Sequence, residues 1–321
     1  MSFFKIGFVK SLSLFNGIFN LYSRVIDRLI PGTTAEWYNR MGSRIVMRKT
    51  GLSELFPGAN ASWLDVLGTG INNQTSEIKH RVGGKDIGFS FSTPNYLSRY
   101  RSDTFSTKEP ETLEWIDTYA PKGGVFFDIG ANVGLYSIYH AKTKQGTTYS
   151  FEPSVFNLKL LVKNINLNDC QERIKIVSNP LTSENSFADF NLQSTEEGGA
   201  LSSFGVDYGH DGNKLNTQIS YQTLGFSLDY LVDNKIIGSI PDTIKIDVDG
   251  IEHLILRGAS KVLANEKCKS VLIEVNDAFV ELADDVDDIL KKAGFMLLAK
   301  KTAETINLES NFTFNQIWVK P

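Results

Sequence analysis

The chain has 321 residues, 41% of them hydrophobic, and its formal net charge at pH 7 is −4. This length and apolar content predict one large or two modest folded domains with a substantial core. A slightly acidic chain gives no sign of a nucleic-acid partner, because such proteins usually present a basic face. Cys170 and Cys268 are far apart and fit no metal or redox spacing, so we expect reduced thiols and a cytoplasmic protein.

Residues 1–30 repeat apolar side chains at helical spacing, which predicts a helix near the N-terminus. Charges at Lys5, Lys10 and Arg24 argue against a membrane-spanning helix. The apolar run is not followed by a small-residue cleavage site, so we do not expect a signal peptide. Two interpretations stay open. The helix packs on the body of the protein or on a second subunit of a homo-oligomer, which we favour, or it lies on a membrane surface as a peripheral contact.

The stretch 52–106 is rich in Gly, Ser, Asn and Thr and contains short alternating runs such as "DIGFSFS", so it predicts short strands and turns. The next stretch, "TKEPETLEWIDTYAPKGG", predicts one helix. Thr107 is a suitable cap for this helix and Pro110 suits its first turn. Leu113 and Ile116 are expected to face inward.

From residue 125 onward, short and mostly continuous apolar runs alternate with helical segments. The runs are "VFFDI", "TTYSF", "IKIV", "TIKIDV" and "SVLIEV", and the helical segments lie at about 133–143, 155–166, 252–264 and 284–293. Continuous apolar strands alternating with helices are typical of a mostly parallel α/β sheet that is covered on both faces. The final runs, "FMLLAKK" and "NQIWVK", predict an antiparallel hairpin at the sheet edge. We therefore divide the chain into a helical region at 1–50, a short-strand and helix region at 51–120, and an α/β domain at 121–321.

Acids fall at the ends of four of these runs, and ligands of α/β sheets bind beyond the carboxyl ends of the strands. These acids are Asp128, Glu152, Asp247 and Glu274. In "DIGANVG" the glycines permit a tight turn and close backbone approach, and the helix start favours a negative ligand group. The acid before the first glycine disfavours a pyrophosphate and suits a ligand with an ammonium group. Glu152, at the end of the next run, can accept two hydrogen bonds from a ribose diol.

Together, five stretches resemble the FkbM family of class I S-adenosylmethionine-dependent methyltransferases. They are "RSDTFSTKEPETLEWID", "FFDIGANVGLYS", "FEPS", "LSSF" and "IKIDVDGIEHLILRGA". The resemblance covers about residues 99–320. It implies a Rossmann-like class I methyltransferase sheet, carrying an N-terminal helical and short-strand extension, with S-adenosyl-L-methionine as cofactor.

The resemblance also implies the cofactor contacts. The turn from Asp128 to Gly134 would hold the methionine portion, through Gly130, Ala131 and Asn132. Glu152, followed by Pro153, would take the ribose hydroxyls, and the adenine would lie near Ser178 and Asn179. The stretch "PLTSENSFADFNL" after these residues looks like an inserted hairpin, as is common in the family. In this family the acceptors are hydroxyl groups of surface polysaccharides, glycolipids or polyketide products.

The segment "KIDVDGIEHLILRGA" carries the expected chemistry. Methyl transfer to a hydroxyl needs alignment and a base or hydrogen bond on the attacking oxygen, and Asp247, Glu252 and His253 are the candidates, in falling order. Asp247, Glu274 and Asn276 could in principle bind a divalent cation. We favour hydrogen bonding for them and predict no metal.

The sequence therefore predicts an O-methyltransferase for a small or glycan acceptor. The glycine- and serine-rich stretch 198–205 is either part of the acceptor pocket or a flexible loop. One alternative is a nicotinamide-dependent oxidoreductase, against which the acid at Asp128 and a missing third glycine argue. Another is a non-catalytic, membrane-associated protein with this fold, which the apolar N-terminal helix motivates.

Overall fold

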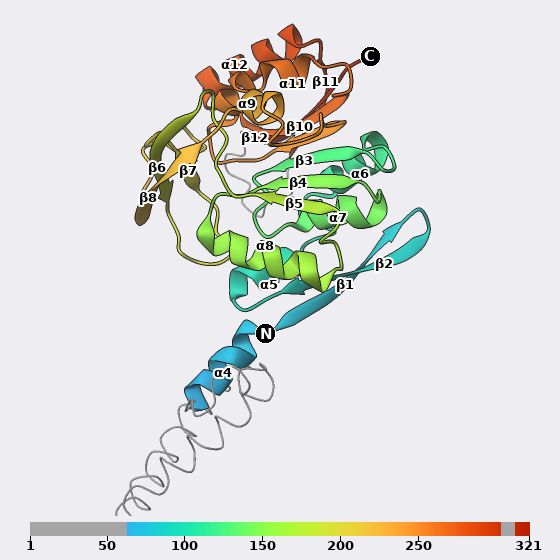
Figure 1. Ribbon diagram of the computed structural model, residues 1–321, viewed down its shortest axis with the longest axis vertical. Helices are drawn as coiled ribbons and strands as arrows, with labels where there is room; N and C mark the ends of the chain where they lie inside the picture. Colours follow the sequence, from blue (N-terminus) through green and yellow to red (C-terminus); the bar gives the residue numbers. More distant parts are fainter. Residues whose placement is uncertain (1–62, 303–311) are drawn as a thin grey trace, which may run out of the picture. The chain divides into compact units, whose positions relative to one another are not determined.

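The computed structural model describes residues 63–302 and 312–321, which fall in two compact units, Met1–Gln74 and Thr75–Pro321 (Figure 1). In the first unit it describes one helix, α4 (Trp63–Asn72). The expected helix of residues 1–30, with its membrane or subunit contact, lies outside the described residues. No helix in the described part is both long and apolar enough to cross a membrane. The rest of the fold concerns the second unit.

A seven-stranded sheet forms the centre of the second unit, in the order β11-β12-β10-β9-β3-β4-β5. Five strands run parallel: β3 (Val125–Ile129), β4 (Thr147–Phe151), β5 (Ile174–Val177), β9 (Thr243–Ile246) and β10 (Ser270–Asn276). Two run antiparallel to their neighbours: β11 (Met296–Thr302) and β12 (Thr313–Val319). The expected Rossmann-like sheet with a C-terminal antiparallel hairpin is confirmed. Of the two hairpin strands, β11 forms the edge of the sheet, and β12 lies between β11 and β10.

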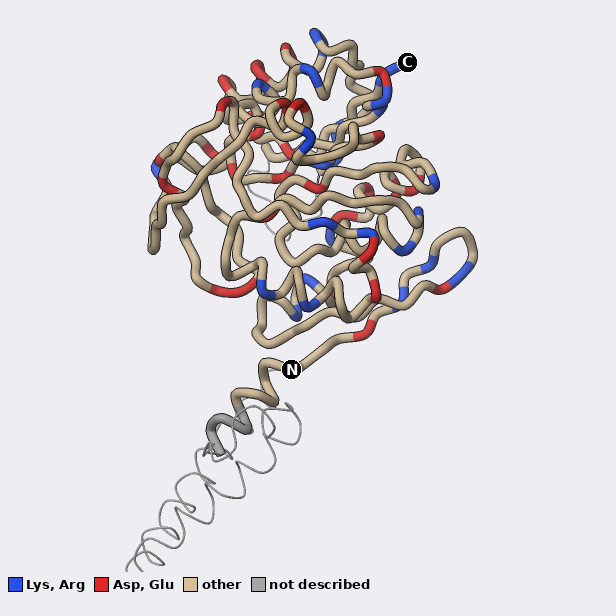
Figure 2. Tube along the Cα trace, in the orientation of Figure 1, with Lys and Arg blue, Asp and Glu red and all other residues tan. Residues whose placement is uncertain are grey.

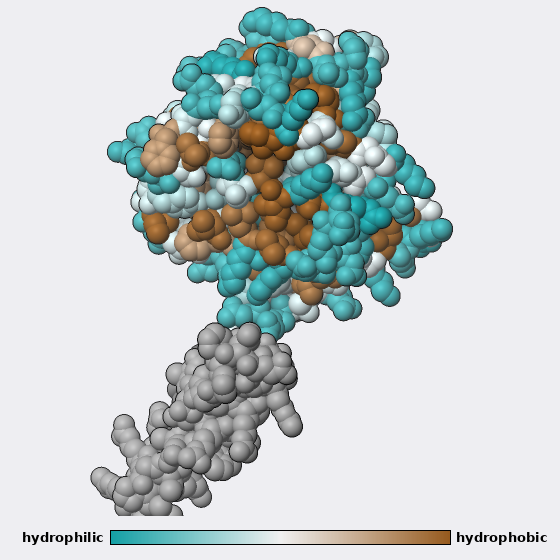
Figure 3. All heavy atoms as spheres, viewed as in Figure 1, coloured by the Kyte–Doolittle hydropathy of each residue, from teal (hydrophilic) through white to brown (hydrophobic). Residues whose placement is uncertain are grey.

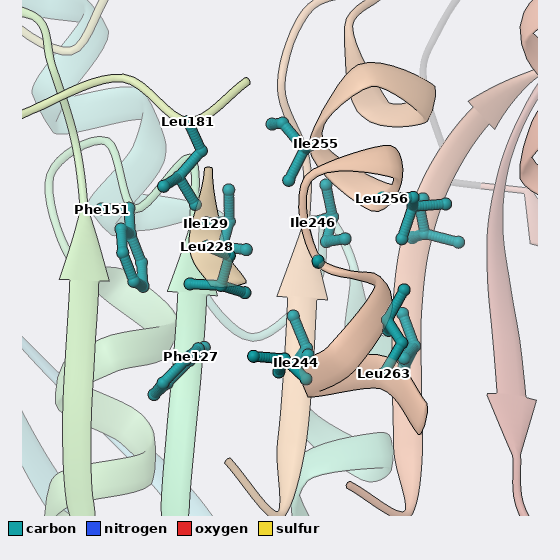
Figure 4. Close-up of a cluster of buried hydrophobic side chains, with 14 of the residues drawn as sticks. Phe127, Ile129, Phe151, Leu181, Leu228, Ile244, Ile246, Ile255, Leu256 and Leu263 are labelled. Atoms are coloured by element: carbon teal, nitrogen blue, oxygen red, sulfur yellow. The ribbon is translucent and has the colours of Figure 1, made fainter. Parts of the chain in front are cut away.

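Both faces of this sheet are buried, which explains its continuous apolar strands. Phe126 and Phe127 of β3 point to opposite faces and belong to two separate core clusters. Figure 1 shows helices on both faces of the sheet. They are α6 (Pro110–Tyr119), α7 (Leu135–Thr143), α8 (Val155–Leu167), α9 (Leu228–Asp233), α10 (Glu252–Arg257), α11 (Ser260–Ala264) and α12 (Val280–Lys292). Figure 4 shows the cluster in which Phe127 and Ile244 of neighbouring strands meet Leu256 and Leu263 of α10 and α11.

Two expected helices differ in their limits. The helix predicted for the 107–124 stretch begins at Pro110, and its cap position is Glu109 rather than Thr107. Its inward face is as expected, since Leu113 and Ile116 are buried. The segment 252–264 divides into α10 and α11 at Gly258, where an added Cβ would lie 2.2 Å from the carbonyl oxygen of Thr182.

The region 52–106 contains more helix than its composition predicted. The antiparallel hairpin of β1 (Thr75–Val82) and β2 (Lys85–Ser92) fits the expectation of short strands. The helices α4 and α5 (Tyr96–Asp103) do not. The side chain of Asn95 accepts a hydrogen bond from the Ser98 backbone N–H at 2.8 Å, and the Ser98 hydroxyl accepts one from the Asn95 backbone N–H at 3.3 Å. This cap starts a helix too polar to show an apolar period.

The insertion between β5 and β9 is a three-stranded antiparallel sheet rather than the expected hairpin. Its order is β7 (Ser202–Phe204), β6 (Ser186–Leu192) and β8 (Ile219–Gly225), so β6 pairs on both sides with strands that follow it in the chain. The next helix, α9, is capped by Ser227, whose hydroxyl accepts from the Tyr230 N–H at 3.2 Å.

Charged and apolar residues share the surface. Acidic and basic residues are both spread over the trace of the second unit (Figure 2). The face drawn in Figure 3 also carries apolar residues between hydrophilic ones. Exposed apolar side chains in the described part include Phe187 and Leu224 on the three-stranded sheet.

Two asparagines, one in α8 and one at its C-cap, join the β1–β2 hairpin to the rest of the second unit. Asn164 is fully buried, and its side chain accepts from the Ser92 N–H at 2.7 Å and donates to the Val133 carbonyl at 2.8 Å. Asn168 accepts from the Ser90 N–H at 3.1 Å and donates to the Ser90 carbonyl at 2.7 Å. Since Val133 lies in the turn after β3, Asn164 joins the hairpin to that turn.

Replacing Asn164 by Leu should lower the free energy of unfolding by about 2–4 kcal/mol, because it leaves two buried backbone groups without partners. Urea denaturation measures the change. Asn166→Leu is the matched control, since Asn166 is exposed on the same helix and bonds only within it. Equal stability of the two variants would contradict the role given to Asn164.

Candidate active site

An open cavity of about 200 Å³ lies at the carboxyl ends of β3, β4, β9 and β10. Three of the four strand-end acids line it: Glu152, Asp247 and Glu274. Its position agrees with the edge expected from the sequence.

The turn after β3 forms one side of the cavity and needs its first glycine. Gly130 has φ +80°, and an added Cβ would lie 1.9 Å from the carbonyl oxygen of Asp247. The N–H groups of Gly130 and Ala131 both donate to the Phe151 carbonyl at 3.0 Å. This turn is therefore pressed against the ends of two neighbouring strands, as the close approach of a glycine allows. Asn132 also lines the cavity, whereas Gly134 does not.

Asp128 lies behind this turn and not on the cavity wall. Its side chain is fully buried, and it accepts a hydrogen bond from Ser137, whose hydroxyl is 2.6 Å from that of Ser150. Burial raises the pKa of Asp128, while the nearby Lys245 ammonium opposes the change. The sequence analysis expected this acid in the cofactor site, but the structure places it behind the turn, where its hydrogen bond to Ser137 joins β3 to α7.

Glu152 faces the cavity with both oxygens held by backbone N–H groups. One oxygen accepts from Asn132 and the other from Ser154, each at 2.8 Å. Burial raises the pKa of this carboxyl to about 7, even though both hydrogen bonds favour the charged form. Ser154 occupies the cap position of α8, but its side chain makes no capping bond.

Beyond Glu152 the cavity becomes partly apolar. Pro153 and Asn179 line it, together with Leu181 and Phe190, whereas Ser178 does not. The Asn179 amide donates to the Leu224 carbonyl at 3.0 Å, which ties this corner to the three-stranded sheet. The corner therefore offers apolar side chains beside an amide, as a flat heterocycle requires.

Asp247 forms an ion pair with a lysine that the sequence analysis missed. The Lys245 ammonium is 2.7 Å from an Asp247 oxygen and 5.1 Å from the ring centroid of Tyr136, and the lysine side chain is only 1% exposed. Burial acts to raise the pKa of Asp247, but the charge and hydrogen bond of Lys245, together with the charges of Lys108 and Arg101, hold the pKa below its usual value. Asp247 is thus an ionised carboxylate on the cavity wall. A lysine inside a β-strand run gives little sign of such a role.

The other two expected catalytic residues do not line the cavity. Glu252 is buried, accepts from the Gly250 N–H at 3.3 Å, and has a pKa that burial raises well above its usual value. His253 is buried with its ring centroid 6.3 Å from that of Phe279, and burial lowers its pKa. Their neighbour Asp249 does line the cavity and accepts from the Ser202 N–H at 2.8 Å. Burial raises the pKa of Asp249 to about 6.

The glycine- and serine-rich loop closes one side of the cavity. Asn132 and Asn157 both donate to the Gly199 carbonyl, at 2.8 and 3.1 Å. The Gly198 N–H donates to Asn157 at 2.8 Å, and the Gly198 carbonyl accepts from Arg101 at 2.7 Å. Of the two interpretations of 198–205, the structure supports a pocket wall.

No group of three His, Cys, Asp or Glu side chains in the described residues could hold a metal ion. Asp247 and Glu274 both line the cavity, but the Asn276 amide turns away from them and donates to the His210 carbonyl at 3.1 Å.

One family model matches this chain. The model of the "Methyltransferase FkbM domain" matches residues 128–297. No curated protein matches the chain.

Similar solved structures include a precorrin-6y C5,15-methyltransferase from Geobacter metallireducens, which is 14% identical (72% of this chain, 94% of that chain, TM-score 0.39). They also include a putative methyltransferase from Streptococcus mutans in complex with SAH, which is 10% identical (67% and 98%, TM-score 0.42). A third is TYW2 from M. jannaschii in complex with AdoMet, which is 12% identical (78% and 89%, TM-score 0.38).

Gly130→Ala should destabilise the protein by about 2–4 kcal/mol, because the new Cβ meets a backbone carbonyl at a φ that alanine rarely adopts. Gly238→Ala is the control, since an added Cβ there meets no atom within 4 Å. Chemical denaturation compares the two. A Gly130→Ala protein as stable as the control would show that the close contact with Asp247 is absent in solution.

Proposed function

Because this chain belongs to the FkbM family of S-adenosylmethionine-dependent methyltransferases, we propose that its strand-end cavity binds the cofactor and that it methylates a hydroxyl of a small or glycan acceptor. The observation that carries the proposal is the Glu152 carboxylate, held on the cavity wall by two backbone N–H groups. Membership in a methyltransferase family argues against both alternatives, the nicotinamide-dependent oxidoreductase and the non-catalytic protein.

Glu152 is suited to the ribose of the cofactor. A carboxylate offers about four acceptor sites, of which the backbone N–H groups of Asn132 and Ser154 occupy two, and the Asn157 side chain also bonds to it. The acceptor capacity that remains suits the adjacent hydroxyl groups of a ribose. The adenine would then lie in the partly apolar corner beside Asn179 and Leu181, and the methionine portion would pass the turn at Gly130.

The cofactor supplies a methyl group that its sulfonium already activates. The protein must align an acceptor hydroxyl and accept its proton. Among the three sequence candidates only Asp247 lines the cavity, and its pairing with Lys245 keeps it ionised. We therefore assign the base to Asp247. Glu274 also lines the cavity, and burial together with the charges of Asp247 and Glu109 raises its pKa to about 8, so it can donate a hydrogen bond to the acceptor.

The polarity of the remaining wall supports a hydroxyl-rich acceptor. Asn157, Ser202 and Asp249 line the cavity beside the Gly199 loop. These groups can pair with several hydroxyls at once, as a sugar of a polysaccharide or glycolipid requires, or a hydroxylated polyketide. Methyl-label transfer to fractionated glycans and lipids of the source organism tests the acceptor class.

Affinity for S-adenosylhomocysteine should rise with pH and level off above about pH 7. Ribose hydroxyls donate to the ionised carboxylate. At a pH below its pKa of about 7, Glu152 is mostly protonated and must lose that proton before the ribose binds, which weakens binding. Calorimetry at pH 5.5 to 8.5 measures this dependence. Glu152→Gln should bind about ten- to a hundredfold more weakly at pH 8 and lose the dependence. The exposed Glu172→Gln should behave as wild type, and equal behaviour of both variants would refute the ribose assignment.

Asp247→Asn should lower kcat by about 10²- to 10⁴-fold, because the amide cannot accept the acceptor's proton. Binding of S-adenosylhomocysteine should persist. Glu252→Gln serves as the comparison, because Glu252 lies off the cavity, and it should retain most of the rate. A loss that follows Glu252→Gln instead would move the base to that residue.

A further inference from the structure

The loop over the cavity contains a leucine in a conformation that leucine rarely adopts. Leu201 has φ 64°, in the left-handed region that glycine enters freely and other L-residues avoid. Gly198 and Gly205 of the same loop also have positive φ, at 87° and 71°, but glycine adopts these angles without strain. A strained residue persists only where its surroundings hold it, and such residues cluster at functional sites. Contacts around Leu201 must therefore offset its strain.

Asp249 supplies contacts of this kind. Its carboxylate accepts a hydrogen bond from the Ser202 N–H at 2.8 Å, and the Leu201 backbone N–H bonds to it as well. Successive backbone N–H groups beside a left-handed residue form a concave site for an anion, and here a carboxylate of the same chain occupies it. The left-handed conformation of Leu201 therefore goes together with the two hydrogen bonds to Asp249.

The same loop is held at a second point, on the cofactor side of the cavity. The Gly199 carbonyl accepts from Asn132, whose own N–H donates to Glu152, the acid proposed for the ribose. Asp249 instead lies two residues after Asp247, the proposed base, and both of these acids line the cavity. The anchor at Gly199 therefore belongs with the cofactor, and the anchor at Asp249 belongs with the acceptor hydroxyl and its base.

We propose that Asp249 is a positioning residue, which holds Leu201 in its left-handed conformation and so fixes the part of the loop wall that places the acceptor. The proposal rests on the methyl transfer proposed above. Ser202 and Ser203 line the cavity directly after Leu201, so relaxation of the leucine would displace this part of the wall. An acceptor that is placed less well should show a higher KM, while the cofactor contacts stay unchanged.

Hydrogen exchange of the loop amides tests the contact without any ligand. At pH 8, above the Asp249 pKa of about 6, the carboxylate is ionised and its hydrogen bonds are charge-assisted. Asp249→Ala should speed exchange of the Leu201 and Ser202 amides by about ten- to a hundredfold. Asp189→Ala is the matched control, since Asp189 is exposed on β6 of the same three-stranded sheet, and it should exchange as wild type does.

Leu201→Gly separates this role from a direct contact between Asp249 and the acceptor. Glycine adopts the left-handed conformation without strain, so the loop should no longer need the carboxylate. In the Leu201→Gly background, Asp249→Ala should therefore change loop exchange and KM by only about two- to threefold, against about tenfold or more in the wild-type background. KM is measured with the glycan or lipid fraction that the wild-type enzyme labels. Calorimetry with S-adenosylhomocysteine should give wild-type affinity for every variant, which also shows that the variants are folded.

Two results would overturn the proposal. Unchanged exchange after Asp249→Ala would show that the carboxylate does not hold the loop. An equal rise of KM in both backgrounds would show that Asp249 acts on the acceptor itself. Failure of the proposed function is a separate result: the wild-type enzyme would then label no fraction, whereas the exchange measurement needs no acceptor and still decides whether Asp249 holds Leu201.

Discussion

The ammonium of Lys245 is buried in the middle of the central sheet, and the chemistry of the cavity depends on it. Removing such a charge from water costs several kcal/mol, so it must have partners in the interior. Asp247 supplies one at 2.7 Å, and Asp128 adds a second negative charge nearby. The same cation decides which acid stays ionised. Asp247 has a lowered pKa, whereas burial raises that of Glu152 to about 7 and that of Glu274 to about 8. One strand residue thus separates a base from acids that hold a proton near neutral pH.

Asn132, in the turn after β3, forms hydrogen bonds both to Glu152 and to the loop at Gly199. Its backbone N–H donates to Glu152, and its side chain donates to the Gly199 carbonyl, both at 2.8 Å. The residue has φ 51°, a left-handed conformation that asparagine tolerates better than most residues. The turn, the proposed ribose acid and the loop over the cavity are therefore held in one geometry. A change in the conformation of the turn would shift both Glu152 and the loop at Gly199.

The sequence predicted the central sheet well because its strands are buried on both faces and read as continuous apolar runs. It missed α5, a polar helix that begins at an asparagine cap, and it did not show that β6 would pair on both sides. The strand-end acids were also readable. Their roles were less so, because which of them faces the cavity depends on distant partners. Ser137 turns Asp128 inward, whereas Ser202 holds Asp249 at the wall. Lys245 could not be found from local pattern, because a lysine within an apolar strand run gives no sign that it is buried between the charges of Asp247 and Asp128.

Two segments outside the alternating core meet over the cavity, and this contact bears on acceptor choice. The segment before α6 reaches the 194–205 loop through Arg101, which donates to Gly198, and through Asn95, which donates to the Glu197 carbonyl at 2.9 Å. Glu152 and Asp247, which directly follow the core strands β4 and β9, line the cavity beneath these two segments. If the cavity binds cofactor and acceptor as proposed, selection among hydroxylated acceptors falls to these two covering segments. A methyltransferase core of this kind can then change its acceptor by altering the cover while the charge arrangement around Lys245 stays fixed.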